Sequence, residues 1–408
     1  MNKSLPPRKT SRDLRLDVFR GLALLTIFVN HVPGNFYERF TSRNFGFSDA
    51  AEAFVLMSGI AVGLAYSRGF RAGDFGSALL RVWRRAGTIY VAHIVTSVIA
   101  IAIVASGILY LDTVDIVRRV NFTRLLDRPL SAMVGIPTLG HQLGYFNILP
   151  LYFTLLIVSP FYIVLGLRNR WAMLGLAFAI WFLAGMFRLN LPNFPNPGGW
   201  FFNPISWQLV YAIGIAMGLS MTEGRKLVPY DSRLFGLAVA FLVLAFFWVQ
   251  LRLGALPGRE TLPFFIASFD KTFVAAPRLL HVLALTYVVV NLPAVAWLIA
   301  TPFFRPVALM GRNGLAVFAT GSVLAIALQV LRARFQTSFF EDTALLAGGI
   351  LVQYGIAWFL TATSEKKRTD EEYQPVPAGQ PAEPPLAGQP GVALYSQSGI
   401  ESRPMRSP

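Results

Sequence analysis

About ten apolar segments, each close to twenty residues long, follow one another along this chain with polar stretches between them. A helix of about 20 apolar residues spans the roughly 30 Å hydrocarbon core of a bilayer. Charged residues make up only 14% of the chain, whereas a soluble domain has about 25%. In lipid the backbone must satisfy its own hydrogen bonds, which a helix does. The sequence therefore predicts an all-α polytopic membrane protein with about ten transmembrane helices.

The basic residues lie in alternate loops between these segments. The predicted spans are residues 14–33, 49–67, 86–109, 145–167, 171–188, 205–222, 234–251, 278–299, 307–331 and 343–362. Arginines and lysines are concentrated near the N-terminus, in the 68–85 loop and after the last span. Cytoplasmic loops carry an excess of such residues. We therefore expect both termini to lie in the cytoplasm.

Three regions follow from this pattern. We expect residues 1–13 to form a cytoplasmic segment and residues 14–363 to form one transmembrane domain. Residues 364–408 are charged and then rich in Pro, Gly, Gln and Ser, a composition typical of disorder, so we expect a disordered cytoplasmic tail.

The charge and the cysteine content exclude several function classes. The net charge is +15, but the basic residues lie where membrane topology explains them, so nucleic-acid binding is not predicted. The chain has no cysteine, which excludes disulfides, thiol nucleophiles and thiolate metal sites. No metal site and no bound cofactor is predicted.

The first predicted span contains ionisable side chains, which are costly in lipid and therefore point to function. Arg20 and His31 are eleven residues apart, so they lie on nearly the same helix face, about 16 Å apart along the axis. Asp17 can pair with Arg20 at i,i+3. Such a pair is either structural, with Arg20 reaching toward the interface, or it receives an anionic substrate inside the bundle.

A histidine at the end of the first span is followed by two acidic residues at the start of the second. His31 could take a proton from a substrate hydroxyl while Asp49 or Glu52 holds its tautomer and stabilises the imidazolium. The alternative is an interfacial histidine that is satisfied by backbone or water. The predicted topology places His141 and His281 on the same outer side, and both are candidates for substrate binding.

Other motifs give weaker signals. Arg312 lies in a Gly-Arg-Asn-Gly turn that could hold a phosphate or could simply begin a helix. Trp200 could stack on a sugar or belong to an interfacial aromatic belt, which is the preferred interpretation for Trp207. Gly59 and Gly63 are spaced for close helix packing.

Several stretches carry a family resemblance. RDLRLDVFRGLALLTIFVNHVPGN, FSDAAEAFVLMSGIAVGLAY, YFNILPLYF and LMGRNGLAVF resemble the OpgC family, and the Arg20-to-His31 spacing resembles the first span of the acyltransferase-3 superfamily. The resemblance covers residues 12 to about 362. The further late-span histidine that is usual in the superfamily is missing here, whereas Glu52 fits the OpgC-like branch.

The resemblance implies an acyltransferase-like domain over residues 14–363 in the bacterial inner membrane. It implies transfer of a succinyl group from succinyl-CoA to hydroxyls of a periplasmic glucan. His31 would take the role of the superfamily histidine and Arg20 that of its arginine. The implied partners are an acyl-CoA donor, a periplasmic glycan acceptor, the lipid bilayer and proteins of glucan synthesis.

Two other functions use the same residues differently. A transporter or flippase for an anionic metabolite or glycan would also contain buried charges, but such proteins usually have paired half-repeats with broken helices, and no repeat is visible in the sequence. A catalytically silent sensor or scaffold would make His31 dispensable.

Overall fold

The structure, a computed structural model, describes residues 14–335 and 338–372, with the side chains of 366–372 left undescribed. All regular structure in this part of the chain is helical, apart from an isolated bridge between Pro192 and Gly199. The first of two units, Met1–Thr363, contains the packed helices, and the second begins at Ser364. The predicted all-α class is therefore confirmed for the described residues.

In the described residues, eight helices are long and apolar enough to cross a membrane. They are α2 (Ala50–Arg71), α3 (Phe75–Leu111), α7 (Ile148–Arg168), α8 (Arg170–Phe187), α9 (Pro204–Thr222), α10 (Ser232–Gln250), α14 (Gly314–Arg334) and the Phe339–Glu365 part of α15 (Phe339–Glu372). A ninth span results if the bent pair α11 (Ala276–Asn291) and α12 (Pro293–Ile299) is counted as one. The prediction of ten spans is met only in part, and the cytoplasmic placement of both termini stays a prediction.

Shorter helices complete the chain. They are α1 (Leu14–Asn30), α4 (Ile116–Arg119), α5 (Thr123–Asp127), α6 (Pro129–Gly135) and α13 (Arg305–Arg312), with 3₁₀ turns at η1 (Phe36–Phe40), η2 (Ser42–Asn44) and η3 (Pro302–Phe304). The first predicted span corresponds to α1, which has 17 residues and is therefore about 25 Å long.

Two predicted spans are interrupted. The span expected at 278–299 bends by 76° between α11 and α12, because Pro293 has no N–H to continue the helix and disfavours helical backbone at Leu292. The span expected at 307–331 is divided at Asn313, where α13 ends and α14 begins. At these two places, apolar content alone predicted one long span where the structure has two shorter helices.

The predicted disorder from Ser364 is wrong at its start. Residues 364–372 continue α15 through Glu372, and this stretch is rich in lysine and glutamate, which favour helix. The remaining tail, 373–408, and the predicted N-terminal segment, 1–13, lie outside the described residues.

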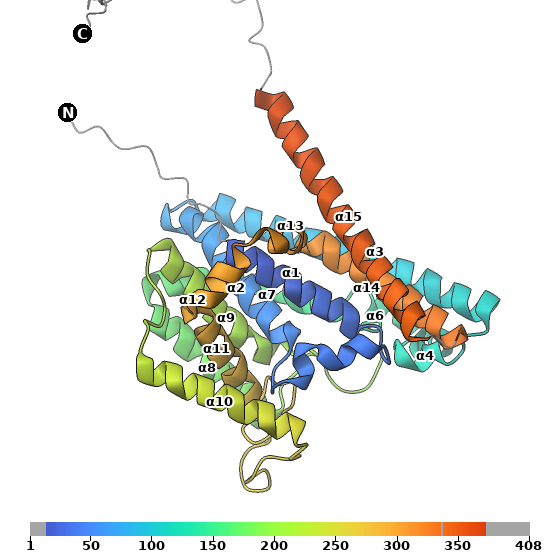
Figure 1. The fold of residues 1–408 in the computed structure, drawn as a ribbon, viewed down its shortest axis with the longest axis horizontal. Coiled ribbons are helices and arrows are strands. Elements are labelled where there is room, and N and C mark those ends of the chain that lie inside the picture. The colour runs from blue at the N-terminus through green and yellow to red at the C-terminus, as the bar shows by residue number, and fades with distance from the viewer. Residues whose placement is uncertain (1–13, 336–337, 373–408) are drawn as a thin grey trace, which may run out of the picture. The chain divides into compact units, whose positions relative to one another are not determined.

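The centre of the first unit is a close contact between α2 and α9 (Figure 1). Gly59 and Gly63 of α2 face Gly214 and Gly218 of α9, and a Cβ on Gly59 would lie 2.2 Å from the Tyr211 carbonyl oxygen. Backbones approach this closely only where side chains are absent. The predicted packing role of Gly59 and Gly63 is therefore confirmed, and α9 supplies a matching glycine pair.

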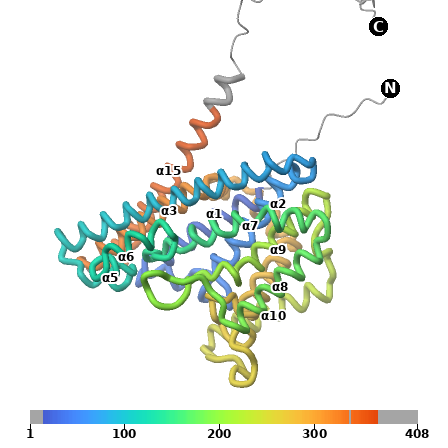
Figure 2. The backbone as a smooth tube through the Cα atoms, turned by 180° about the vertical axis from the view of Figure 1, so that it is seen from behind, coloured from blue at the N-terminus to red at the C-terminus, as the bar shows by residue number. Residues whose placement is uncertain are grey.

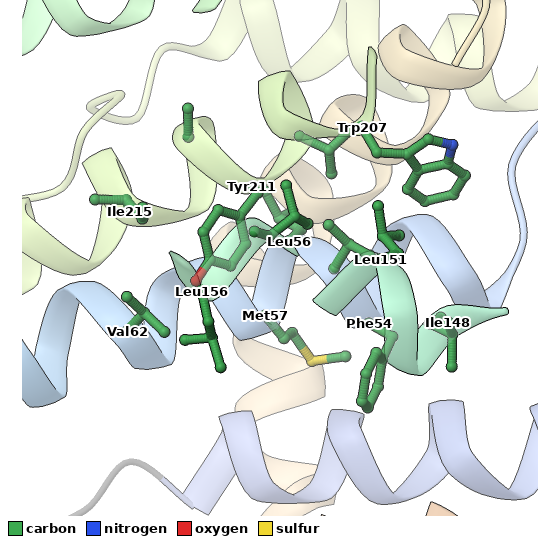
Figure 3. Packing of buried hydrophobic residues seen from close by; sticks show 14 of the residues in the cluster. Phe54, Leu56, Met57, Val62, Ile148, Leu151, Leu156, Trp207, Tyr211 and Ile215 are labelled. Carbon is green, nitrogen blue, oxygen red and sulfur yellow. The ribbon is translucent and has the colours of Figure 1, made fainter. Parts of the chain in front are cut away.

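Large side chains fill the space around this contact. Figure 3 shows Leu56 of α2 beside Tyr211 of α9, with Leu151 and Leu156 of α7 close by. Trp207 is completely buried in the same cluster, and its indole N–H donates to the Lys271 carbonyl oxygen at 3.0 Å. The interfacial-belt interpretation of Trp207 is therefore wrong, because α9 lies inside the bundle.

Two further contacts position α1 and α3. A Cβ on Gly311 of α13 or on Gly21 of α1 would meet the backbone of the opposite helix, so α1 and α13 lie side by side. The long helix α3 passes along α7 (Figure 2). Helix α14 also packs against α3. Helix α1 also contacts α2 and α14.

The glycine contact predicts that Gly59→Ala destabilises the bundle. The added methyl group would force α2 and α9 apart, and overpacking of this kind costs about 1–3 kcal/mol. We expect a lower midpoint of thermal unfolding in detergent micelles. Gly236→Ala in α10 is the control, because a Cβ there meets nothing within 4 Å. Equal midpoints for the two variants would contradict this account of the core.

Candidate functional site

His31 directly follows the last residue of α1. Its backbone N–H donates to the Ile27 and Phe28 carbonyl oxygens, and its own carbonyl oxygen accepts from Gln329 Nε2 at 2.7 Å. The imidazole stacks on the ring of Tyr145, with centroids 4.2 Å apart and planes 12° apart. Its Nδ1 is buried and has no hydrogen-bond partner among the described residues. The ring is thus held by packing, and one nitrogen is available for a proton or a substrate.

Asp49 and Glu52 form a capping box at the start of α2. Asp49 accepts from the Ala51 N–H at 2.8 Å, and Glu52 accepts from the Asp49 N–H at 3.0 Å. This arrangement satisfies N–H groups that every helix start leaves free. The D-x-x-E spacing is the sequence signature of such a box, and the sequence interpretation missed it.

Two cations neutralise these carboxylates. Lys271 Nζ lies 2.5 Å from Asp49 Oδ2, and Arg278 lies 3.2 Å from Asp49 and 2.6 Å from Glu52. The Glu52 side chain is fully buried and that of Arg278 is 11% exposed. Neither cation was singled out from the sequence, because no spacing rule links them to residues more than 220 positions earlier. We call Asp49, Glu52, Lys271 and Arg278 the carboxylate cluster.

The carboxylate cluster acts on His31 through space. Asp49 lies just before the first residue of α2. Burial alone would raise the pKa of Asp49, but the charges of Lys271 and Arg278 hold that pKa well below its usual range. Two charges reach the imidazole in opposite senses: that of Lys271 disfavours a second proton on the ring, and that of Asp49 favours one. In the described residues no hydrogen bond joins His31 to Asp49 or Glu52, so the expectation that one of them holds its tautomer directly is wrong. Their oxygens are already bound by α2 and the two cations.

A second charged group lies at the beginning of α1. Asp17 pairs with Arg20 at 3.8 Å, as predicted, and with Arg312 of α13 at 3.5 Å. Arg20 also donates to the Gly311 carbonyl oxygen at 3.5 Å. The Gly-Arg-Asn-Gly turn therefore joins two helices, and it brings Arg312 beside Arg20.

A cavity of about 180 Å³ opens beside this charged group. It is lined by Arg20, Phe54, Ser58, Ala61, Val62, Ala65, Tyr66, Arg85, Ile148, Leu149, Tyr152, Arg312, Gly314, Leu315 and Phe318. We call it the arginine cavity. Its lining comes from α1, α2, α3, α7, α13 and α14, and Ser58 lies beside the Tyr152 hydroxyl.

The lining of the arginine cavity combines charged and apolar side chains. Arg20, Arg85 and Arg312 give it positive charge. Toward the start of α7 the lining is apolar, with Ile148 and Phe54. Tyr145, the stacking partner of His31, lies three residues before Ile148. The cavity thus combines three arginines with an apolar part near the start of α7, and neither His31 nor Tyr145 belongs to its lining.

The remaining candidates lie outside the arginine cavity. His141 is buried in the connection before α7, where its Nδ1 is 3.3 Å from Asn196 Nδ2, and burial followed by the Arg124 charge lowers its pKa. His281 of α11 bonds Ser48 through Nδ1 at 2.7 Å. Trp200 is 5% exposed and donates to the Pro192 carbonyl oxygen, so its faces are not open to a sugar.

The burial of the carboxylate cluster predicts a large effect of Arg278→Met. Removing one partner of a buried ion pair costs about 3–5 kcal/mol, because the other charge stays buried. The double variant Arg278→Met with Glu52→Gln should recover much of the lost stability, as measured by thermal unfolding. Arg71→Met is the matched control, since the Arg71–Glu223 pair is exposed and such pairs contribute about 0–1 kcal/mol. Additive effects of the two cluster substitutions would contradict a direct pair.

Comparison with known proteins gives one finding. Neither the curated proteins nor the solved structures include a match to this chain. A family model described as "OpgC protein" matches residues 12–365. This range includes His31, the carboxylate cluster and every residue that lines the arginine cavity. The chain therefore belongs to the OpgC protein family.

Proposed function

We propose that this protein is a membrane O-acyltransferase that moves an acyl group, succinyl from succinyl-CoA, to a hydroxyl of a periplasmic glucan at the bacterial inner membrane. OpgC proteins are generally transferases, which supports the reaction class. The observation that carries the proposal is the arginine cavity, which is lined by Arg20, Arg85 and Arg312 and by the first residues of α7. The chain enters α7 from Tyr145, the stacking partner of His31.

The arginines of this cavity suit the anionic part of an acyl-CoA donor. Guanidinium groups bind phosphate through paired, charge-assisted hydrogen bonds. Arg312 is 44% exposed at its side chain, so it can meet a ligand that arrives from outside the bundle. The apolar lining around Phe54 and Leu149 would then accommodate the uncharged arm that carries the thioester.

The environment of His31 suits the transfer step. In this step the acceptor hydroxyl gives its proton to the imidazole while its oxygen forms a bond to the thioester carbonyl carbon. The carbon–sulfur bond then breaks, and the thiolate of CoA takes the proton from His31. Asp49 stabilises the imidazolium by its charge, and Lys271, whose charge also reaches the ring, stabilises the oxyanion that forms on the carbonyl.

The transporter alternative is favoured by one observation, the 76° break between α11 and α12. Transporters place such breaks at their substrate site. Neither α11 nor α12 contributes to the lining of the arginine cavity, so in this chain the helix break lies outside that cavity. The alternative predicts movement of a substrate that keeps its acyl group.

Mass spectrometry of periplasmic glycans tests the proposal. Cells without the protein should lose a succinyl-sized mass from their glucans, and wild-type protein should restore it. His31→Ala should restore about 10²- to 10⁴-fold less, because a general base contributes that much. His93→Ala is the matched control, since His93 is buried in α3 and does not line the arginine cavity.

Protein abundance is measured in the same membranes. Full restoration by stably inserted His31→Ala would remove His31 from the chemistry, and unchanged glycans in cells without the protein would contradict acyl transfer.

A further inference from the structure

A second cavity, of about 290 Å³, lies at the end of α10. It is lined by Arg43, Gly46, Phe47, Trp248, Val249, Arg252, Gly254, Phe269 and Arg278. We call it the α10 pocket. Its walls come from the connection between α1 and α2, the last turn of α10, the loop after α10, and α11.

Local contacts fix these walls. Gln250 Nε2 donates to the Asn44 carbonyl oxygen at 2.7 Å and joins the end of α10 to the connection after α1. The Trp248 indole donates to the Gly254 carbonyl oxygen at 3.1 Å. Phe47 and Phe269 lie with ring centroids 4.6 Å apart. The pocket is therefore formed by bonded and packed residues.

The lining combines positive charge with aromatic faces. Three arginines and three aromatic rings line the pocket, and no carboxylate does. Arg43 pairs with Glu38 at 3.2 Å, and Arg278 belongs to the carboxylate cluster. Arg252 makes no ion pair with any residue that the structure describes. A ligand with an anionic group beside a flat, weakly polar face matches this lining, and a sugar ring that carries a carboxylate or phosphate has both features.

Arg278 connects the α10 pocket to the candidate site. It lines the pocket and also donates to Glu52 and Asp49, and the charge of Asp49 acts on His31. A ligand in the pocket would therefore be bound beside the carboxylate cluster, and the charge of Asp49 in that cluster reaches His31, where we place the transfer. Small-molecule sites span about 300–1,000 Å³, so the pocket would take one end of a chain and leave the rest free.

We propose that the α10 pocket binds an anionic residue of the glycan acceptor, held by Arg252 and by the faces of Trp248 and Phe269, so that a neighbouring hydroxyl reaches His31. This inference rests on the proposed acyltransferase function, and it adds that the acceptor is recognised by its negative charge.

The test uses two acceptor probes, a glucose hexasaccharide and the same hexasaccharide with its terminal residue oxidised to a uronic acid. Purified protein in lipid nanodiscs receives succinyl-CoA, and kcat/KM is measured for each probe. We expect wild-type protein to prefer the acidic probe. Arg252→Gln should lower the acidic-to-neutral ratio about tenfold, because it removes a charge-assisted hydrogen bond. Arg259→Gln, in the same loop but outside the pocket lining, should leave the ratio unchanged.

Direct binding of the acidic hexasaccharide, measured by calorimetry without donor, separates this inference from the proposed function. If no acyl group is transferred but the acidic probe binds wild-type protein and not Arg252→Gln, acyl transfer fails and the pocket assignment stands. If transfer occurs with the same ratio in wild-type protein and Arg252→Gln, the pocket assignment is overturned. Loss of the preference for the acidic hexasaccharide in Trp248→Leu, as in Arg252→Gln, would support the pocket assignment.

Discussion

Two carboxylates at the start of α2 and the two cations that neutralise them hold the functional part of this protein together. Glu52 is fully buried, so its charge is tolerated only because Arg278 binds it. Asp49 uses one oxygen to cap α2 and the other to bind Lys271 and Arg278. The segment from Lys271 to Arg278 is thereby held against the start of α2. His31, the arginine cavity and the α10 pocket all depend on where this junction places α2 and α11.

The first helix carries the two ends of the proposed reaction. Its early turns contribute Arg20 to the arginine cavity, and His31 follows its last turn. The close contact between α1 and α13 at Gly21 and Gly311 fixes the arginine end. At the other end, stacking on Tyr145 and the bond from Gln329 fix the histidine. One helix therefore sets the distance between Arg20 and His31.

The sequence predicted what depends on local spacing. Apolar length predicted the helical membrane class, the i,i+3 spacing predicted the Asp17–Arg20 pair, and the glycine spacing predicted the α2–α9 contact. Long-range pairing was not predictable: Lys271 and Arg278 meet Asp49 only because α11 folds back onto α2. The expectation that a carboxylate holds His31 failed because the oxygens are already bound. The D-x-x-E spacing signals the share taken by the start of α2, but nothing in the sequence signals the share taken by Lys271 and Arg278. Pro293 is the sequence signal for the bend after α11, and the prediction from apolar content did not include it.

Site-directed labelling tests the central claim, that the donor occupies the arginine cavity. The chain has no cysteine, so a single cysteine can be placed at will. Ala65→Cys puts a thiol in the cavity lining, and Ser77→Cys puts one on an exposed turn at the start of α3. Saturating succinyl-CoA should slow the reaction of a water-soluble maleimide at position 65 and leave its rate at position 77 unchanged. An unchanged rate at position 65, in protein that still transfers succinyl groups, would contradict the account.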